Sequence, residues 1–119
     1  MGAKQVDFLV PNRFKHGYGL SPEIVNEARI DKEPDLIITV DNGISSVEGA
    51  ALARSFGIDV IITDHHKPDE KLPKAFAILN PNRFDCDYPF KGLCGAGVAF
   101  KFALAYCEKY ARDPELVWE

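Results

Sequence analysis

The chain has 119 residues, of which 46% are hydrophobic and 27% are charged, a balance typical of a globular domain with a buried core. It contains neither the apolar run of roughly 20 residues that a membrane-spanning helix needs nor the apolar segment of a signal peptide, which predicts a cytoplasmic protein without a membrane partner. The net charge of −4 means that a polyanion would have to be attracted locally or through metal ions.

The first half of the chain contains two predicted strands and a helix between them. Residues Val6 to Val10 are predicted to form a first strand. The run Ser21-Pro22-Glu23 predicts the start of a helix, because a hydroxyl cap, a proline in the first turn and a nearby acid all favour one. Residues 35–41 are almost continuously apolar, which is typical of a strand covered on both faces.

The second half repeats this alternation. Residues Ser45 to Glu48 match the capping box and predict a helix over 46–56 that ends at Gly57. Two more apolar runs and a final helix are expected over residues 58–63, 75–79 and 98–110. Strands and helices that alternate with short links predict an α/β fold, in which a parallel sheet has helices on both faces.

Polar side chains stand where three of these runs end. Asp41 ends one predicted strand, the triplet Asp64-His65-His66 ends the next, and Asn80 follows the third run. Parallel strands end at the same edge of a sheet, so these side chains are expected to lie close together. A lone aspartate at a strand end is usually a turn residue. Two carboxylates beside two imidazoles instead suit a divalent cation such as Mn²⁺, which activates water and offsets phosphoryl charge.

An ordered set of motifs resembles the RecJ group of the DHH phosphoesterase superfamily. The Asp-His-His triplet alone is a weak signal, but the whole set covers almost the entire chain and is specific. The matching blocks are Val40 to Ser45, Thr63 to His66, Asn80 to Asn82 and Cys94 to Lys101, with Val10 to Phe14 and Gly17 to Ser21 resembling RecJ in particular.

The resemblance implies a Rossmann-like DHH domain and a 5′-to-3′ exonuclease that acts on single-stranded DNA in repair and recombination. It also implies a two-metal centre that uses Mn²⁺ or Mg²⁺. By position in the motifs, Asp41 and His65 would be metal ligands, and Asp64 would be a ligand or a carboxylate that orients a histidine. His66 would contact the scissile phosphate or act as the acid when the product leaves.

Four residues are further candidates for substrate binding. Arg13 is either a phosphate contact, since guanidinium groups pair with phosphate in a bidentate manner, or a solvated loop residue. Asn80 is expected to join the polar set at the strand ends. Gly95 and Gly97 either let backbone N–H groups approach a phosphate at a helix N-terminus or provide a tight turn with close helix packing.

Parts of the RecJ pattern have no counterpart in this sequence: an Asp-x-Asp-x-Asp-Gly block on an earlier strand, an aspartate beyond the last helix, and a second, substrate-binding domain. Residues 85–87 copy only the first spacing of that block and are predicted to be a loop. Residues 1–119 are therefore predicted to be a partial DHH domain that is inactive by itself. It is expected to self-associate through the sheet edge that the missing strand would leave unpaired.

Three alternatives remain open at this point. Other DHH phosphoesterases, which hydrolyse pyrophosphate, nano-RNA or cyclic dinucleotides, share the metal chemistry and differ in the substrate domain. A non-catalytic DNA-binding relative would be expected to have lost Asp41 or the triplet, and both are present. A dinucleotide-binding protein is disfavoured, because Gly17 and Gly19 do not continue into a third glycine at the required spacing.

Overall fold

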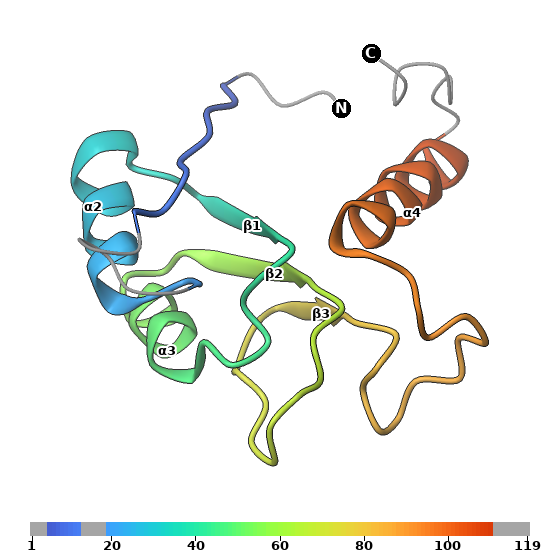
Figure 1. Ribbon diagram of the computed structural model, residues 1–119. Helices are drawn as coiled ribbons and strands as arrows, with labels where there is room; N and C mark the ends of the chain where they lie inside the picture. The colour runs from blue at the N-terminus through green and yellow to red at the C-terminus, as the bar shows by residue number, and fades with distance from the viewer. Residues whose placement is uncertain (1–4, 13–18, 111–119) are drawn as a thin grey trace.

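The computed structural model describes residues 5–12 and 19–110. Its centre is a parallel sheet in which β1 (Leu36–Val40), β2 (Asp59–Thr63) and β3 (Ala77–Leu79) lie side by side in the order β1-β2-β3 (Figure 1). β1 and β2 pair along their whole length, from Leu36 opposite Asp59 to Val40 opposite Thr63. The predicted α/β fold with a parallel sheet is therefore confirmed.

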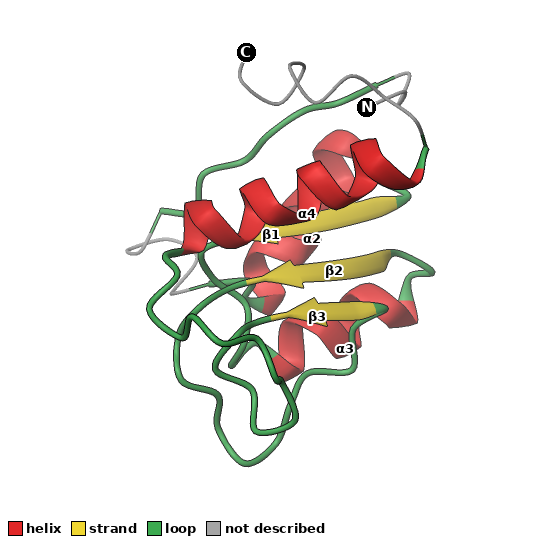
Figure 2. Ribbon diagram, turned by 90° about the vertical axis from the view of Figure 1, so that its right-hand side faces the viewer, coloured by secondary structure: helices red, strands yellow, loops and turns green. Residues whose placement is uncertain are grey.

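Helices cover both faces of this sheet, as the sequence predicts (Figure 2). α2 (Pro22–Lys32) and α3 (Val47–Ser55) pack together on one face, and α4 (Gly95–Lys109) lies on the other. None of the helices within residues 5–12 and 19–110 has both the length and the apolar character required to cross a membrane.

The start of α2 follows local rules, whereas the start of α3 does not. The Ser21 hydroxyl accepts a hydrogen bond from the Ile24 N–H at 3.3 Å, as expected of a helix cap. Ser46 also stands at a helix start, but its hydroxyl makes no capping bond to α3 and accepts the N–H of Leu20 at 3.1 Å. The predicted capping box, in which Ser45 is the cap and Glu48 its partner, is therefore wrong, because the cap position is one residue later, at Ser46, and the Ser46 hydroxyl bonds to a distant segment. Gly57 ends α3 with a positive φ of 75°.

The main hydrophobic core lies between the sheet and the layer of α2 and α3. Its side chains are at most 6% exposed, so each is removed almost completely from water, which contributes about 1.5–3 kcal/mol for a large aliphatic residue. The buried residues are Leu20, Ile24, Val25, Ala53, Ile58, Val60 and Ile62. This core fixes the two longer strands in register and thereby aligns their carboxyl ends.

The other face of β1 is covered less completely. Leu36, Ile38 and Val40 are 44%, 41% and 49% exposed, although α4 packs against both β1 and β2. The prediction of a strand buried on both faces is therefore wrong for β1. An apolar run predicts the strand itself, but how much of each face is covered depends on the elements that pack there.

The predicted strand over Val6 to Val10 does not form. Val6, Phe8 and Val10 are 76–83% exposed, and residues 5–12 contain no strand. This segment is held by an ion pair of 2.8 Å between Asp7 and Lys32 in α2. Its alternating apolar residues favour extended backbone, but a strand also needs a neighbour within hydrogen-bonding reach.

α4 begins at Gly95, three residues before the predicted start at Val98. The difference arises at Cys94, whose Sγ accepts the Gly97 N–H at 3.4 Å and so caps the first turn. Cys107, on the same helix, is 1% exposed and is therefore a small buried hydrophobic residue.

Candidate metal centre

Two strand ends bring four possible metal ligands together at the carboxyl edge of the sheet. Asp41 directly follows β1, and Asp64, His65 and His66 directly follow β2. The Asp41 N–H donates to the Thr63 carbonyl at 2.9 Å, which continues the ladder past the strands. One ligand atom from each of the four residues lies within 4.8 Å of the others. The predicted convergence at this edge is therefore present.

Asp64 is the most deeply buried residue of the cluster, with only 1% of its surface exposed. Its Oδ2 accepts the Ile44 N–H at 3.0 Å, and its Oδ1 accepts the N–H groups of His65 at 2.8 Å and His66 at 3.3 Å. Burial raises the pKa of this carboxyl, but the hydrogen bonds from Ile44, the His66 ring and the two backbone amides outweigh it and lower the pKa below its ordinary value. Asp64 is therefore a carboxylate that the protein itself solvates.

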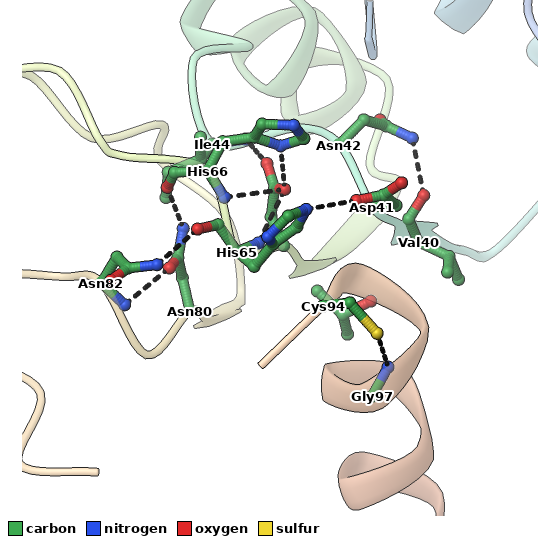
Figure 3. A network of polar contacts seen from close by, with 12 residues as sticks. Val40, Asp41, Asn42, Ile44, His65, His66, Asn80, Asn82, Cys94 and Gly97 are labelled. Carbon is green, nitrogen blue, oxygen red and sulfur yellow. Dashed lines mark hydrogen bonds and ion pairs between the residues drawn. The ribbon is translucent and has the colours of Figure 1, made fainter. Parts of the chain in front are cut away.

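The His66 ring is oriented by Asp64, because its Nδ1 lies 2.6 Å from Asp64 Oδ1 (Figure 3). A carboxylate can only accept hydrogen bonds, so this contact favours a proton on Nδ1. In the neutral ring, Nε2 then carries the lone pair, which makes it the nitrogen suited to a metal or to proton transfer.

Asp41 and His65 face one another across the two strand ends. His65 Nε2 lies 2.8 Å from Asp41 Oδ1, and the two side chains are 33% and 57% exposed (Figure 3). Asp41 adopts the left-handed conformation, with φ of 64°, which aspartate tolerates better than most residues. The turn after it is held by Asn42, whose side chain donates to the Val40 carbonyl at 3.0 Å.

The first turn of α4 lies directly against Asp41. A Cβ added at Gly95 would overlap the Asp41 side chain, including its Oδ1. A Cβ added at Gly97 would come within 2.7 Å of Leu93 Cδ1, and the Gly97 N–H is donated to Cys94. Close packing thus explains why both positions need a residue without a side chain. A contact of their N–H groups with phosphate stays a prediction. The positive end of α4 also favours a carboxylate beside it.

Two asparagines hold the backbone of the histidine pair. Asn80, which is 4% exposed, donates from Nδ2 to the His66 carbonyl at 2.8 Å and accepts the Asn82 N–H at its Oδ1, also at 2.8 Å. Asn82 donates from Nδ2 to the His65 carbonyl at 2.5 Å. Both ends of the Asn80 side chain are thus used inside the protein, and its predicted contact with substrate remains untested.

Sequence reasoning missed the role of Asn82 and the contact between Gly95 and Asp41. The spacing of the Asn-Pro-Asn motif was a usable signal for Asn82, because amides two residues apart after a strand can brace the neighbouring loop. No pattern in the sequence indicated that Gly95 meets Asp41. Arg13, the remaining predicted substrate contact, lies outside the described residues.

A cleft of about 480 Å³ opens beside the cluster. It reaches from the starts of α2 and α3 to the ends of the strands, and Asp64 and His66 form part of its wall. A second hollow of about 300 Å³ lies at the opposite edge of the sheet, around Asp59 and Phe76, and contains none of the four clustered residues. The cleft therefore meets the cluster on its His66 side, whereas Asp41 is itself 57% exposed to solvent.

The donor set fits a divalent cation. Carboxylate oxygens and imidazole nitrogens together suit Mn²⁺ and similar ions, and four such groups converge here. The hydrogen bond from His66 Nδ1 to the Asp64 carboxylate resembles the carboxylate–histidine pairs that orient metal ligands in proteins. Within the described residues, this is the group whose geometry would allow it to hold a metal ion.

Comparisons with known proteins agree on one family. The family model described as DHH family, N-terminal domain, matches residues 1–117. The single-stranded-DNA-specific exonuclease RecJ of Escherichia coli (strain K12) is 57% identical over 105 residues, which cover 88% of this chain and 18% of that protein. The chain thus spans about a fifth of the length of this curated relative.

Solved structures give the same result. A crystal structure of exonuclease RecJ bound to manganese matches with a TM-score of 0.74 and 34% identity, over 89% of this chain and 26% of that one. RecJ of Thermus thermophilus in complex with Mn²⁺ matches with a TM-score of 0.64 and 32% identity, over 78% of this chain and 14% of that one. Because the family model spans nearly every residue, the chain belongs to the DHH family.

Proposed function

We propose that this chain is the metal-binding part of a single-stranded-DNA-specific exonuclease. The observation that carries the proposal is the convergence of Asp41, Asp64, His65 and His66 at one sheet edge, in a chain 57% identical to such an exonuclease over 105 residues. We further propose that residues 1–119 form a partial DHH domain that is inactive by itself. The expected polarity, 5′ to 3′, rests on the resemblance to RecJ.

Asp41 and His65 are proposed to hold Mn²⁺ or Mg²⁺, because they are the exposed pair whose ligand atoms face each other. Both oxygens of Asp64 accept hydrogen bonds from the protein, so its proposed role is to orient the ligands and shape the turn that carries them. When bound, such a cation supplies activation of water and stabilisation of the phosphoryl charge.

His66 is proposed to move a proton at the scissile phosphate. Asp64 holds its Nδ1, which directs Nε2 away from that carboxylate. A protonated Nε2 can donate to the departing oxygen when the phosphodiester bond breaks, and the neutral ring can take the proton back from solvent. The cleft along the His66 side supports this assignment, because it leaves room for the phosphate there.

Calorimetric titration of this chain with Mn²⁺ tests the metal site. His65→Ala and Asp41→Asn are each expected to weaken Mn²⁺ binding at least about tenfold. Asp59→Asn is the matched control, because it removes a carboxylate at the other end of β2, and its binding should equal that of the unaltered chain. Binding that is unchanged in His65→Ala and Asp41→Asn would overturn the site.

The substrate class is tested on the full-length protein that carries this chain. Oligonucleotides labelled at the 5′ or the 3′ end, single-stranded or duplex, are compared with pyrophosphate and a cyclic dinucleotide in the presence of Mn²⁺. The proposal expects release of mononucleotides from the 5′ end of single strands alone. Faster hydrolysis of pyrophosphate or the cyclic dinucleotide would instead identify one of the other DHH phosphoesterases.

Self-association through the outer edge of β1 is a second, separate proposal. The backbone groups of Asp35 and Asp41 form hydrogen bonds to β2. In a parallel strand, successive residues bond alternately to one side and the other, so the N–H and C=O groups of Leu36, Ile38 and Val40 point away from β2, towards the outer edge of the sheet. No other strand within the described residues pairs with this edge. Its half-exposed apolar side chains support association with a second copy.

Light scattering over a range of concentrations tests this association. The chain is expected to shift from monomer towards dimer as its concentration rises, and Ile38→Lys should keep it monomeric. Ile30→Lys is the control, because Ile30 is 67% exposed on α2, away from the strand edge. A monomer at the highest concentration would contradict the proposal. Cytoplasmic location and the absence of a membrane partner stay predictions.

A further inference from the structure

Three large aromatic side chains are exposed on the loop that connects β3 to α4. Phe84, Tyr88 and Phe90 are 81%, 37% and 61% exposed. Exposed aromatic residues are common when scattered singly, but these occupy one short loop between Leu79 and Gly95. Their number in one place calls for a physical explanation.

The cationic side chains of the same loop are hydrogen-bonded to carbonyl groups of the protein. Lys91 Nζ donates to the carbonyls of Pro81 and Cys86, each at 2.6 Å. Arg83 binds Asp85 through two hydrogen bonds of 2.9 and 2.8 Å and donates to the Ile78 carbonyl at 2.8 Å. Both cations are thus engaged by groups of the protein, although Lys91 itself stays exposed, and the three aromatic rings are left at the surface, where large apolar side chains are less often found.

This loop is also tied to the metal centre. The side-chain amide of Asn82 donates both to the His65 carbonyl and, at 3.3 Å, to the Lys91 carbonyl. The loop leaves β3 at the carboxyl edge of the sheet, where the four clustered residues lie, and returns to that edge at the start of α4 (Figure 1). The loop that carries the exposed rings is therefore attached at both of its ends to the proposed catalytic edge.

We propose that Phe84 and Phe90, flanked by Tyr88, form a surface on which unpaired bases of a single-stranded nucleic acid stack next to the metal centre. This inference rests on the proposed function, which supplies a single-stranded substrate at this edge. Aromatic rings accept any base, because every base has a flat π face, whereas paired bases present no free face.

The net charge of the chain explains why a stacking surface would be needed for binding a nucleic acid. With a net charge of −4, the chain gains little from general attraction to phosphates, and the cations of this loop are engaged within it. Stacking provides affinity that does not depend on net positive charge. It also restricts binding to strands whose bases are exposed, which matches the substrate proposed for the site.

Fluorescence anisotropy with a labelled oligothymidylate, in buffer without added metal, tests the surface on this chain. Phe84→Ala and Phe90→Ala are each expected to weaken binding about 5- to 100-fold. Phe76→Ala is the matched control, because Phe76 is 76% exposed but precedes β3, at the other edge of the sheet. Its affinity should remain within about twofold of that of the unaltered chain.

An oligonucleotide of the same length without bases separates stacking from attraction to phosphate. It should bind weakly, and Phe84→Ala should not weaken it further. The proposal is overturned if the unaltered chain does not bind oligothymidylate, if both variants bind it unchanged, or if they lose affinity equally for the strand without bases. A surface that serves only to contact another protein segment would give the second of these results.

Titration of the same variants with Mn²⁺ tests the stacking surface separately from the metal site of the proposed function. Phe84→Ala and Phe90→Ala should bind Mn²⁺ as the unaltered chain does, because neither residue belongs to the cluster. Loss of oligonucleotide binding with retained Mn²⁺ binding supports the stacking surface. Unchanged oligonucleotide binding with retained Mn²⁺ binding removes that surface and leaves the metal site intact.

Discussion

The ends of β1 and β2 contribute to the same cluster but are built in different ways. At the end of β2, Asp64 is 1% exposed and accepts hydrogen bonds from three backbone amides and the His66 ring. At the end of β1, the Asp41 side chain is 57% exposed, and its carboxylate pairs with His65 at 2.8 Å. One end is held by a buried hydrogen-bond network and the other by packing at the surface.

This difference separates two tasks that a metal site needs. Buried hydrogen bonds fix the geometry of the turn and of the histidines before any ion arrives, which lowers the cost of assembling the site. An exposed carboxylate is open to an incoming cation, and the protein does not have to bury it as an unpaired charge before the ion binds. The buried Asp64 network at the end of β2 is therefore expected to control stability, whereas the Asp41 and His65 pair, in which Asp41 is exposed, is expected to control metal affinity.

Asp64→Ala should produce the largest loss of stability among changes at the two strand ends. It leaves the Ile44 N–H without its acceptor and removes the partner of His66, so the free energy of unfolding should fall by about 3 kcal/mol. Asp41→Ala at the exposed end should lower it by less than about 1 kcal/mol. Urea denaturation of the metal-free chain, followed by circular dichroism, measures both. Equal losses would contradict the proposed division of roles.

Gly95→Ala should affect metal binding more than stability. The added methyl group would displace the Asp41 carboxylate, so affinity for Mn²⁺ should fall about tenfold. Gly92→Ala is the control, since a Cβ there meets only the Phe90 ring at an ordinary 3.4 Å. Calorimetry on the two variants measures the difference. Unchanged affinity in Gly95→Ala would mean that Asp41 is free to move or does not bind the ion.

The sequence predicts the framework of this site better than its supports. Apolar runs ending in Asp41 and in the Asp64 triplet were sufficient to predict a parallel sheet with both groups at one edge, because parallel strands end together. The parallel pairing followed from the alternation of strands and helices with short links. The parallel sheet and the residues of the cluster could therefore be predicted without knowledge of contacts between distant segments.

Apart from the start of α4, which Cys94 caps locally, the features that were missed or mispredicted involve contacts between distant segments. Ser46 matches a local capping rule, yet its hydroxyl accepts the N–H of Leu20, which lies 26 positions earlier. Val6 to Val10 has a strand pattern but no neighbouring ladder within the described residues. Gly95 meets Asp41 only after α4 has folded onto the sheet. Periodicity and capping motifs describe neighbours in sequence, so they cannot reveal such contacts.

Acidification should weaken the buried end selectively. The hydrogen bonds that lower the pKa of Asp64 in the folded chain stabilise folding above the ordinary carboxyl pKa, and this contribution is lost as the pH falls below 3.8 through the lower pKa of the folded state. The loss should be smaller than that in Asp64→Ala, because a protonated carboxyl still accepts hydrogen bonds.

Thermal unfolding between pH 6 and 2.5, about the range over which carboxyl groups protonate, measures this dependence. Asp64→Asn cannot change its charge, so its stability should vary less with pH than that of the unaltered chain. Asp85→Asn is the control, since the hydrogen bonds from Arg83 lower the pKa of Asp85 in the same direction, but at the surface. Equal flattening by both substitutions would show that the buried carboxylate has no special part in acid sensitivity.

Asn82→Ala is expected to cause a small loss of stability, but one that still exceeds the loss caused by the corresponding change after β1. Asn82 links its loop to the His65 carbonyl across 17 positions of sequence, and losing this bond should cost about 1 kcal/mol of stability. Asn42→Ala is its counterpart after β1, where the amide bonds only to Val40, two positions away. That loss should stay below about 0.5 kcal/mol.

Because the Asn82 bond fixes the backbone that carries His65, Asn82→Ala should also weaken Mn²⁺ binding severalfold. If Asn42→Ala weakens it equally, the two ends are supported alike and the contrast between them fails.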